Sequence, residues 1–325
     1  MGDVTYGACC VDDLSARAMG CDYLLHYGHS CLVPVTADDA VTTTDDVKLH
    51  LRPLRTLYIF VEIGIDTDHL VACAEKNFGD DRSTIRLVLM GTIQFTGAVH
   101  EASISLKSKG FNHVEFPQAK PLSAGETLGC TSPRLDYPVE PSTSGGSGGR
   151  SVLLFVADGR FHLESAMIHN PELEAYRYDP YGKAITRERY DTPRMMALRY
   201  GHIQRAQHAK RWGVVLGTLG RQGNPAIVKH VRTLLTRHGR RHVVVLLSEV
   251  FPAKLALFRN VDAWVQVACP RLSIDWGEAF DKPVLTPYET MVAFGEAEWR
   301  SIYPMDYYAK DSGPWTNPYH ASREG

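Results

Sequence analysis

Three cysteines, far apart in the chain, are the residues whose types and contexts best suit chemistry: Cys9, Cys130 and Cys269. They lie 121 and 139 residues apart, and two share nearly the same context, since Cys130 opens C-T-S-P-R-L and Cys269 opens C-P-R-L. This echo predicts repeated units that each contribute one ligand to a shared site. Three thiolates suit a soft metal or an iron–sulfur cluster with one position left open for substrate.

Cysteine is also a common buried hydrophobic residue, and this ordinary interpretation applies to Cys21, Cys31 and Cys73. The three cysteines named first differ, because each follows an apolar segment and precedes a polar or proline-marked turn. In open parallel sheets, sites assemble in the loops beyond the carboxyl ends of strands. Zinc fingers and ferredoxins place their cysteines about two to four residues apart, so the repeated context, and not the spacing, favours a metal site here.

A glycine-rich turn, G-T-L-G-R-Q-G-N at 217–224, lies between a predicted strand and a predicted helix. Glycine allows close backbone approach to a ligand, so the turn is typical of a phosphate- or nucleotide-binding loop. It matches neither the dinucleotide-binding nor the Walker pattern, and a plain tight turn is an equally good interpretation. Arg221 is suited to pair with a carboxylate. The cofactor contacts expected from this turn are Gly217, Thr218, Arg221 and Gln222.

A second candidate turn, A-D-G-R-F-H at 157–162, also leads from a strand into a helix. Asp158, with Gly159 beside it, can meet ribose hydroxyls, and His162 is a candidate ligand contact. The ordinary interpretation is that Asp158 and Gly159 only form the turn. His26 and His29, in H-Y-G-H, are either buried histidines or proton carriers. No side chain is assigned as a catalytic acid, base or nucleophile.

The elements that must position these residues are short apolar strands alternating with amphipathic helices, a pattern that predicts an α/β fold with parallel sheets. We expect strands at 55–63, 84–95, 112–118, 150–159, 174–181, 212–220, 241–250, 262–269 and 282–289. We expect helices at 67–79, 99–110, 160–171, 225–239 and 251–261.

Three related domains follow from this series, at 1–83, 84–208 and 209–300, with a C-terminal tail at 301–325. Each domain is expected to be a small parallel sheet with flanking helices, and the three are arranged around a central cluster site. The first begins just before its cysteine, so we expect that its opening strand and helix are truncated or supplied elsewhere. The stretch 142–150 reads as a flexible loop, and the tail as a surface wrap or a partly disordered segment.

Composition is that of an ordinary globular protein, with 44% apolar and 22% charged residues in 325. The net charge of −2 does not indicate nucleic acid or an anionic membrane, and we expect charges spread too evenly to outline a docking surface. The apolar runs are too short to span a bilayer, and the N-terminus does not resemble a signal peptide. Apart from the adjacent Cys9 and Cys10, the seven cysteines are not closely paired, so they do not indicate a disulfide framework, and the expected location is the cytoplasm.

Seven segments, in order, resemble the diphthamide synthase family in its eukaryotic type, over about residues 2 to 290. The segments are GDVTYGACCVDD, HYGHSCLVPV, GETLGCTSPRL, ADGRFHLESAMIHNP, VVLGTLGRQGN, LSEVFPAKL and VQVACPRLSIDWG. The resemblance implies a [4Fe–4S] cluster held by Cys9, Cys130 and Cys269, one from each domain. Cys9 fits the family ligand because it falls in G-A-C, and Cys10 is the alternative. The family also carries a further N-terminal segment.

The resemblance also implies a reaction, the first step of diphthamide biosynthesis. S-adenosylmethionine binds the open iron, and reduction of the cluster cleaves the bond from sulfur to the methionine γ-carbon. The 3-amino-3-carboxypropyl radical then adds to the imidazole C2 of a histidine on translation elongation factor 2. Implied partners are a paralogous second subunit, that elongation factor and a small electron-donor iron protein. Two alternatives remain: a non-catalytic scaffold subunit of the same complex, or a Rossmann-type methyltransferase with structural cysteines.

Overall fold

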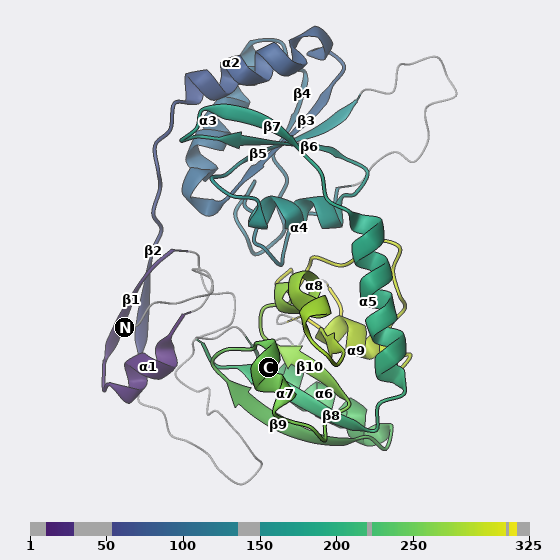
Figure 1. Cartoon of the computed structure of the whole chain (residues 1–325). Coiled ribbons are helices and arrows are strands. Elements are labelled where there is room, and N and C mark those ends of the chain that lie inside the picture. Colours follow the sequence, from purple (N-terminus) through teal and green to yellow (C-terminus); the bar gives the residue numbers. More distant parts are fainter. Residues whose placement is uncertain (1–10, 29–53, 136–149, 220–222, 310–311, 317–325) are drawn as a thin grey trace. The chain divides into compact units, whose positions relative to one another are not determined.

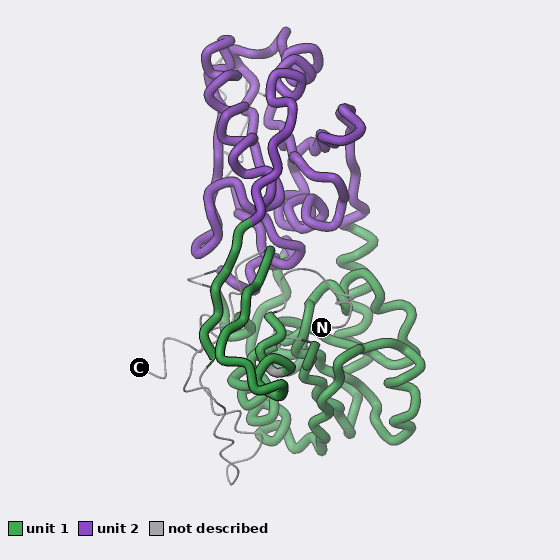
Figure 2. Tube along the Cα trace, turned by 90° about the vertical axis from the view of Figure 1, so that its left-hand side faces the viewer, with its two compact units in different colours: residues 1–60, 193–300, 311–325 green, residues 61–192, 301–310 purple. Residues whose placement is uncertain are grey.

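The computed structural model describes residues 11–28, 54–135, 150–219, 223–309 and 312–316. The chain divides into two compact units (Figure 2), each built from separate stretches of sequence. Unit 1 comprises 1–60, 193–300 and 311–325, and unit 2 comprises 61–192 and 301–310. Among the described residues, no helix has both the length and the apolar character needed to cross a bilayer.

Unit 2 is built on a five-stranded sheet in the order β4-β3-β5-β6-β7 (Figure 1). All neighbouring strands are parallel except β6 and β7, which form an antiparallel pair at one edge. The central strands read as near-continuous apolar runs because both faces of a parallel sheet are covered. The strands are β3 (Arg86–Gly91), β4 (His113–Glu115), β5 (Ser151–Val156), β6 (Glu174–Asp179) and β7 (Ala184–Glu188).

Helices cover both faces of this sheet. Helices α2 (Thr67–Phe78) and α3 (Thr96–Ser108) pack on the face that carries Leu87 and Leu89. Helix α4 (Phe161–His169) packs on the opposite face. Two short 3-10 helices, η1 (Gly79–Asp81) and η2 (Ile93–Phe95), lie in the connections. The result is a three-layer α/β unit with a buried sheet.

Unit 1 contains a four-stranded parallel sheet in the order β11-β10-β8-β9. Helices α5, α6 and α9 pack on one face, and α7 and α8 on the other. The strands are β8 (Arg211–Gly217), β9 (Arg241–Leu247), β10 (Ala263–Val267) and β11 (Val284–Leu285). The helices are α5 (Thr192–Gln207), α6 (Pro225–Arg237), α7 (Pro252–Ala256), α8 (Arg271–Trp276), η3 (Gly277–Ala279) and α9 (Pro287–Ala293).

Near the N-terminus, helix α1 (Asp13–Ala18) precedes a parallel pair of strands, β1 (Tyr23–Tyr27) and β2 (Arg55–Ile59). A small apolar cluster that includes Val11 and Leu24 joins them. The mainly parallel α/β class predicted from the sequence is therefore confirmed. The three domain boundaries stay a prediction.

Several individual elements differ from the prediction. The strand expected at 84–95 ends at Gly91, and the helix expected at 251–261 is confined to Pro252–Ala256. The strand expected at 282–289 is only Val284–Leu285, because Thr286 caps helix α9. The loop expected at 142–150 lies outside the described residues except Arg150.

Candidate functional site

Cys130 lies in a loop beyond the carboxyl end of strand β3. The preceding segment runs along that end, since the Thr127 N–H donates to the carbonyl of Gly91 at 3.2 Å. Glu126 also forms a bridge with Gly91. The Cys130 side chain is buried, and the Thr131 hydroxyl donates to its sulfur at 3.9 Å. This position agrees with the expectation that the cysteine follows a strand end of a parallel sheet.

Polar side chains fix the backbone that follows Cys130. The Asn170 amide donates to the carbonyl of Pro133 at 3.0 Å and accepts from the Leu135 N–H at 2.9 Å. The Ser132 hydroxyl donates to the carbonyl of Ser165 at 3.1 Å. These contacts tie the cysteine loop to helix α4, and sequence reasoning did not anticipate them.

Residues 303–308 form the other side of the Cys130 loop. The Ser132 N–H donates to the carbonyl of Met305 at 2.9 Å, and the Tyr308 N–H donates to the Thr131 hydroxyl at 3.0 Å. The side chains of Tyr303 and Met305 are fully buried. The prediction of a surface wrap or disordered tail from residue 301 is therefore wrong for this segment. Its backbone is hydrogen-bonded to the cysteine loop, and the side chains of Tyr303, Tyr307 and Tyr308 are buried.

The turn that carries Asp158 and Gly159 lies close to the Cys130 loop. Strands β3 and β5 are adjacent, and the turn follows the end of β5. The Phe161 ring, at the start of α4, packs so closely on Gly129 that a Cβ there would overlap it. Asp158 is exposed, and its backbone carbonyl accepts from Arg177 at 3.2 Å. Both sequence-predicted features therefore gather at one edge of the unit 2 sheet.

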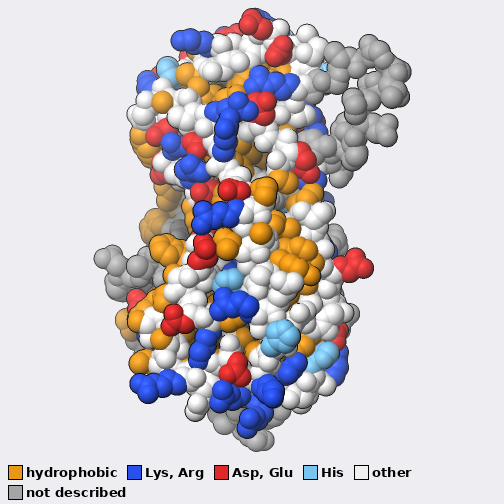
Figure 3. All heavy atoms as spheres, turned by 45° about the vertical axis from the view of Figure 1, so that its right-hand side comes forward, with side chains coloured by type: hydrophobic (Ala, Val, Ile, Leu, Met, Phe, Trp, Pro, Cys, Tyr) orange, Lys and Arg blue, Asp and Glu red, His pale blue; other side chains and the backbone are white. Residues whose placement is uncertain are grey.

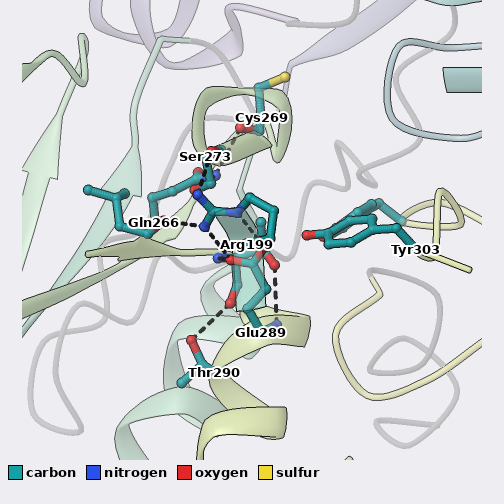
Figure 4. A network of polar contacts seen from close by, with 10 residues as sticks. Arg199, Gln266, Cys269, Ser273, Glu289, Thr290 and Tyr303 are labelled. Carbon is teal, nitrogen blue, oxygen red and sulfur yellow. Dashed lines mark hydrogen bonds and ion pairs between the residues drawn. The ribbon is translucent and has the colours of Figure 1, made fainter. Parts of the chain in front are cut away.

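Cys269 follows strand β10 in unit 1, again beyond the carboxyl end of a parallel strand. Gln266 in β10 is fully buried, and its Nε2 donates to the carbonyl of Cys269 at 3.0 Å and to the hydroxyl of Ser273 at 3.1 Å. Figure 4 shows that the Cys269 sulfur points away from this polar network. Gln266 therefore holds the backbone of the cysteine loop.

Beneath this loop lies a buried ion pair between Arg199 and Glu289 (Figure 4). It is bidentate, with distances of 2.7 Å from Nε to Oε1 and 2.6 Å from Nη2 to Oε2. The guanidinium also donates to the carbonyls of Ser273 and Val284, both at 2.7 Å. Glu289 closes a capping box with Thr286 at the start of α9. One arginine thus joins α5, α8, β11 and α9, which fixes the framework behind Cys269.

His202, one turn after Arg199 on α5, is buried beside this ion pair. Burial, reinforced by the positive charges of Arg199 and Arg205, lowers the pKa of His202 to about 4. Its Nδ1 is buried without a hydrogen-bond partner among the described residues. The neutral imidazole is therefore the form that the folded protein favours near neutral pH.

The glycine-rich turn approaches the Cys269 loop at the same edge of the unit 1 sheet. Strands β8 and β10 are neighbours, and a Cβ on Gly223 would overlap the carbonyl oxygen of Val267. Asn224 caps α6 by accepting from the Ala226 N–H at 2.8 Å. At the start of the turn, the Thr218 N–H donates to the carbonyl of Leu247 at 2.9 Å. Glycine is thus required for close approach between two loops.

The remaining predicted residues are accounted for as follows. Gly217 is the buried last residue of β8. Cys130 belongs to unit 2 and Cys269 to unit 1, and each is described within its own unit. The predicted residues outside the described part are Cys9, Cys10, His29, Cys31, Arg221 and Gln222.

The cysteines and histidines given ordinary interpretations contact neighbouring side chains of their own units. Cys73 packs against the unit 2 core, where burial raises the pKa of its thiol, and Cys21 packs on the N-terminal cluster. His26 contacts Tyr58 edge to face. His162 is half-buried next to Phe161.

The shared P-R-L sequence after each cysteine has a structural basis. Arg134 pairs with Glu172 at 3.0 Å, and Arg271 pairs with Asp275 at 2.9 Å. The next residue is a buried leucine in both cases, Leu135 and Leu272. Each cysteine loop therefore ends in an arginine held by a carboxylate and a leucine anchored in the core. The echo reflects repeated anchoring of the two loops as well as the two cysteines.

Comparison with known proteins decides the family. The family model described as "Putative diphthamide synthesis protein" matches residues 1–304. The chain belongs to this family. It is 54% identical over 317 residues to the 2-(3-amino-3-carboxypropyl)histidine synthase subunit 1 of Gallus gallus, covering 97% of this chain and 70% of that protein. For the protein of the same name in Homo sapiens, identity is 52%, over 97% of this chain and 66% of that protein.

In Schizosaccharomyces pombe, the protein of that name is 47% identical, over 97% of this chain and 68% of its own length. The chain thus spans about two thirds of the length of these family members. Among solved structures, it resembles Dph2 from Pyrococcus horikoshii at 28% identity and a TM-score of 0.64, over 93% of this chain and 79% of that one. The same protein solved with a 4Fe-4S cluster gives 28% identity and a TM-score of 0.65, over 95% and 80%.

Proposed function

We propose that this chain is the cluster-bearing subunit of a 2-(3-amino-3-carboxypropyl)histidine synthase. It would transfer the 3-amino-3-carboxypropyl group of S-adenosylmethionine to a histidine of translation elongation factor 2, the first step of diphthamide biosynthesis. The family relatives carry this synthase name, and Dph2 has been solved with a 4Fe-4S cluster. The observation that carries the proposal is that Cys130 and Cys269 each follow a strand in a loop with dedicated polar anchors.

The donor set fits such a cluster. Cys9, Cys130 and Cys269 would hold it, because thiolate sulfur is the preferred ligand of iron–sulfur clusters. When bound, the cluster supplies the electron for cleavage of S-adenosylmethionine and an iron without a protein ligand. Cys10 is the alternative to Cys9. The Thr131 hydroxyl, which donates to the Cys130 sulfur, would stabilise its thiolate form.

The other residues of the site would hold the reactants in position and shield them from water. Asn170 and Gln266 hold the two cysteine loops, and residues 303–308 exclude water from the Cys130 backbone. Asp158 and Gly159 would meet the ribose hydroxyls of S-adenosylmethionine. The glycine-rich turn would receive its amino-acid end through the backbone, with contacts from Gly217, Thr218, Arg221 and Gln222.

The proposed partners are a paralogous second subunit, elongation factor 2 and a small electron-donor iron protein. The work of such an assembly on a translation factor would take place in the cytoplasm. This part of the proposal rests on the family and on the subunit naming of the relatives.

Anaerobic purification with iron and sulfide analysis tests the cluster, and S-adenosylmethionine cleavage under reduction tests the reaction. We expect about four irons per chain and a brown colour. Cys130→Ala, Cys269→Ala and Cys9→Ala should each lose the iron, while Cys73→Ala, a change of a packed cysteine in α2, keeps it. Cys10→Ala keeps it if Cys9 is the ligand. The iron and sulfide analysis and the cleavage assay should both be carried out on this chain and on an N-terminally extended version.

A colourless, iron-free protein that methylates a substrate would instead support the methyltransferase alternative. A protein with iron that does not cleave S-adenosylmethionine in either version would support the scaffold alternative.

A further inference from the structure

The distribution of charge along the chain is strongly uneven. Residues 192–248 contain 11 Lys and Arg and no Asp or Glu. The rest of the chain contains 24 Lys and Arg and 37 Asp and Glu, which gives it a charge of −13. The net charge of −2 for the whole chain therefore conceals a basic segment within an acidic remainder. The expectation of evenly spread charges is therefore wrong. Figure 3 shows Lys, Arg and His side chains gathered on the lower part of the face drawn.

Several of these cations meet at the amino ends of strands β8 and β9. Arg211 and Arg241 are the first residues of the two strands and lie directly opposite each other in the parallel register. Like charges in opposed positions are unfavourable, so this pair needs compensation. Asp262 forms an ion pair with Arg211 at 2.9 Å, and the hydrogen bond from Arg211 lowers the pKa of Asp262 to about 2. Among the described residues, no carboxylate lies within ion-pair distance of Arg241.

A surface cavity of about 570 Å³ opens beside these arginines. Arg259 also lines it, and no described carboxylate pairs with this side chain either. Its apolar wall includes Val243 and Leu257, whose side chains are 45% and 77% exposed. The cavity therefore combines two cations lacking carboxylate partners with apolar surface that is in contact with water.

A second cavity, of about 250 Å³, adjoins the first at Arg259. Lys282, Asp281 and the buried Trp264 line it as well, so this cavity carries one acidic residue beside its two cations. The indole N–H of Trp264 is buried without a hydrogen-bond partner in the described part of the chain. A buried donor without an acceptor is uncommon, and a ligand that brings an acceptor would satisfy it. This observation is independent of the charge pattern.

We propose that the paired cavities bind an acidic segment of a partner protein, one that carries an aliphatic or aromatic side chain among its carboxylates. The carboxylates would pair with Arg241 and Arg259, and the apolar side chain would cover Leu257. A carbonyl or carboxylate oxygen of the segment would accept from Trp264. The site lies at the amino ends of the strands, whereas Cys269 follows their carboxyl ends, so a segment bound here leaves the Cys269 loop uncovered.

An acidic peptide fits these cavities better than a nucleic acid does. Single-stranded nucleic acids bind grooves in which exposed aromatic rings stack on the bases. Trp212 in the first cavity is buried and Phe258 is only half-exposed, so the exposed apolar group is aliphatic. The cations without carboxylate partners are also too few to track a phosphate backbone.

The test uses fluorescence anisotropy with a labelled peptide of sequence Asp-Glu-Glu-Leu-Phe-Glu-Asp-Asp and the whole chain. We expect saturable binding that weakens as salt is added, because the contacts are ionic. Arg241→Ala and Arg259→Ala should each weaken binding about tenfold, as expected for loss of a charge-assisted contact. Arg232→Ala is the matched control, since it removes an exposed cation of α6 that does not line either cavity. Circular dichroism checks that each variant remains folded.

Four results would overturn the proposal. The first is absence of peptide binding at low salt, and the second is an equal loss in Arg232→Ala, which would show a diffuse charge effect. The third is equal binding of a peptide with Ser in place of Leu and Phe, which would remove the role of Leu257. The fourth is efficient competition by single-stranded oligothymidine, which would show a nucleic-acid site.

Discussion

The side-chain amide of Gln266 donates a hydrogen bond of 3.0 Å to the backbone carbonyl of Cys269, three residues ahead of it. A buried amide in the otherwise apolar strand β10 thus fixes the start of a candidate ligand loop. Gln266→Leu keeps the size of the side chain and removes both of its hydrogen bonds. We expect the Cys269 thiol to react several-fold faster with iodoacetamide, because its loop opens more often. Mass spectrometry of the modified peptide measures this rate.

Gln207→Leu, an equivalent change at the exposed end of α5, is the control and should leave the rate unchanged. An unchanged rate in Gln266→Leu would show that α8 alone holds the loop. The assay uses iron-free protein, because a cluster held by Cys269 would protect its thiol from alkylation.

The ion pair between Arg199 and Glu289 makes a prediction about stability. Glu289→Gln retains the side-chain acceptor that a capping box needs but removes the negative charge. It leaves the buried guanidinium without a counterion, so we expect the free energy of unfolding to fall by about 3–5 kcal/mol. Urea denaturation followed by circular dichroism measures the change.

Replacing both members, as in Arg199→Met with Glu289→Gln, should cost less than Glu289→Gln alone. This recovery is expected because no uncompensated charge is then buried. If the double variant is as unstable as the sum of the two single variants, the charges do not act as a pair.

The buried His202 predicts that acid destabilises unit 1. Its pKa is lowered from an ordinary value of 6.5 to about 4, so between these values the unfolded chain binds more protons than the folded chain. The free energy of unfolding should therefore fall as pH decreases from about 6.5 to about 4, by at most about 3 kcal/mol. His202→Gln removes this contribution, and urea denaturation over the same pH range should give a shallower slope. Parallel slopes would contradict the assignment.

Substitutions at two glycines distinguish the effect of steric overlap from the effect of backbone conformational freedom on stability. Gly223→Ala places a methyl group against the carbonyl of Val267, and backbone atoms cannot move aside cheaply. We expect a loss of about 1–3 kcal/mol in the free energy of unfolding. Gly201→Ala is the counterpart, because nothing lies near a Cβ there and the residue is inside α5. It should stabilise by about 0.5–1 kcal/mol, as alanine favours a helix. Thermal unfolding of both variants checks the opposite signs.

Local patterns were sufficient for the fold class. Apolar runs such as those of β3 and β5 indicated buried parallel strands, and the structure contains them. Helix α9 was missed although its signal was present, since Thr286 and Glu289 form a capping box with a proline between them. Gln266 was also visible as the single amide in an apolar strand. The prediction for the final aromatic residues was wrong because they belong to no helix or strand, and the backbone of their segment bonds to the Cys130 loop, which is far away in sequence.

Unit 2 is not one continuous stretch of chain, and this has a consequence for how the protein is made. The backbone beside Cys130 is completed by residues 303–308, which leave the ribosome only after the sheet of unit 1 has been synthesised. Until then the Cys130 loop of the nascent chain is incomplete, because the N–H of Ser132 lacks its acceptor, the carbonyl of Met305. Closure of this loop therefore requires synthesis of residues 303–308, so a chain that terminated at residue 300 would retain every candidate ligand and still lack a completed loop.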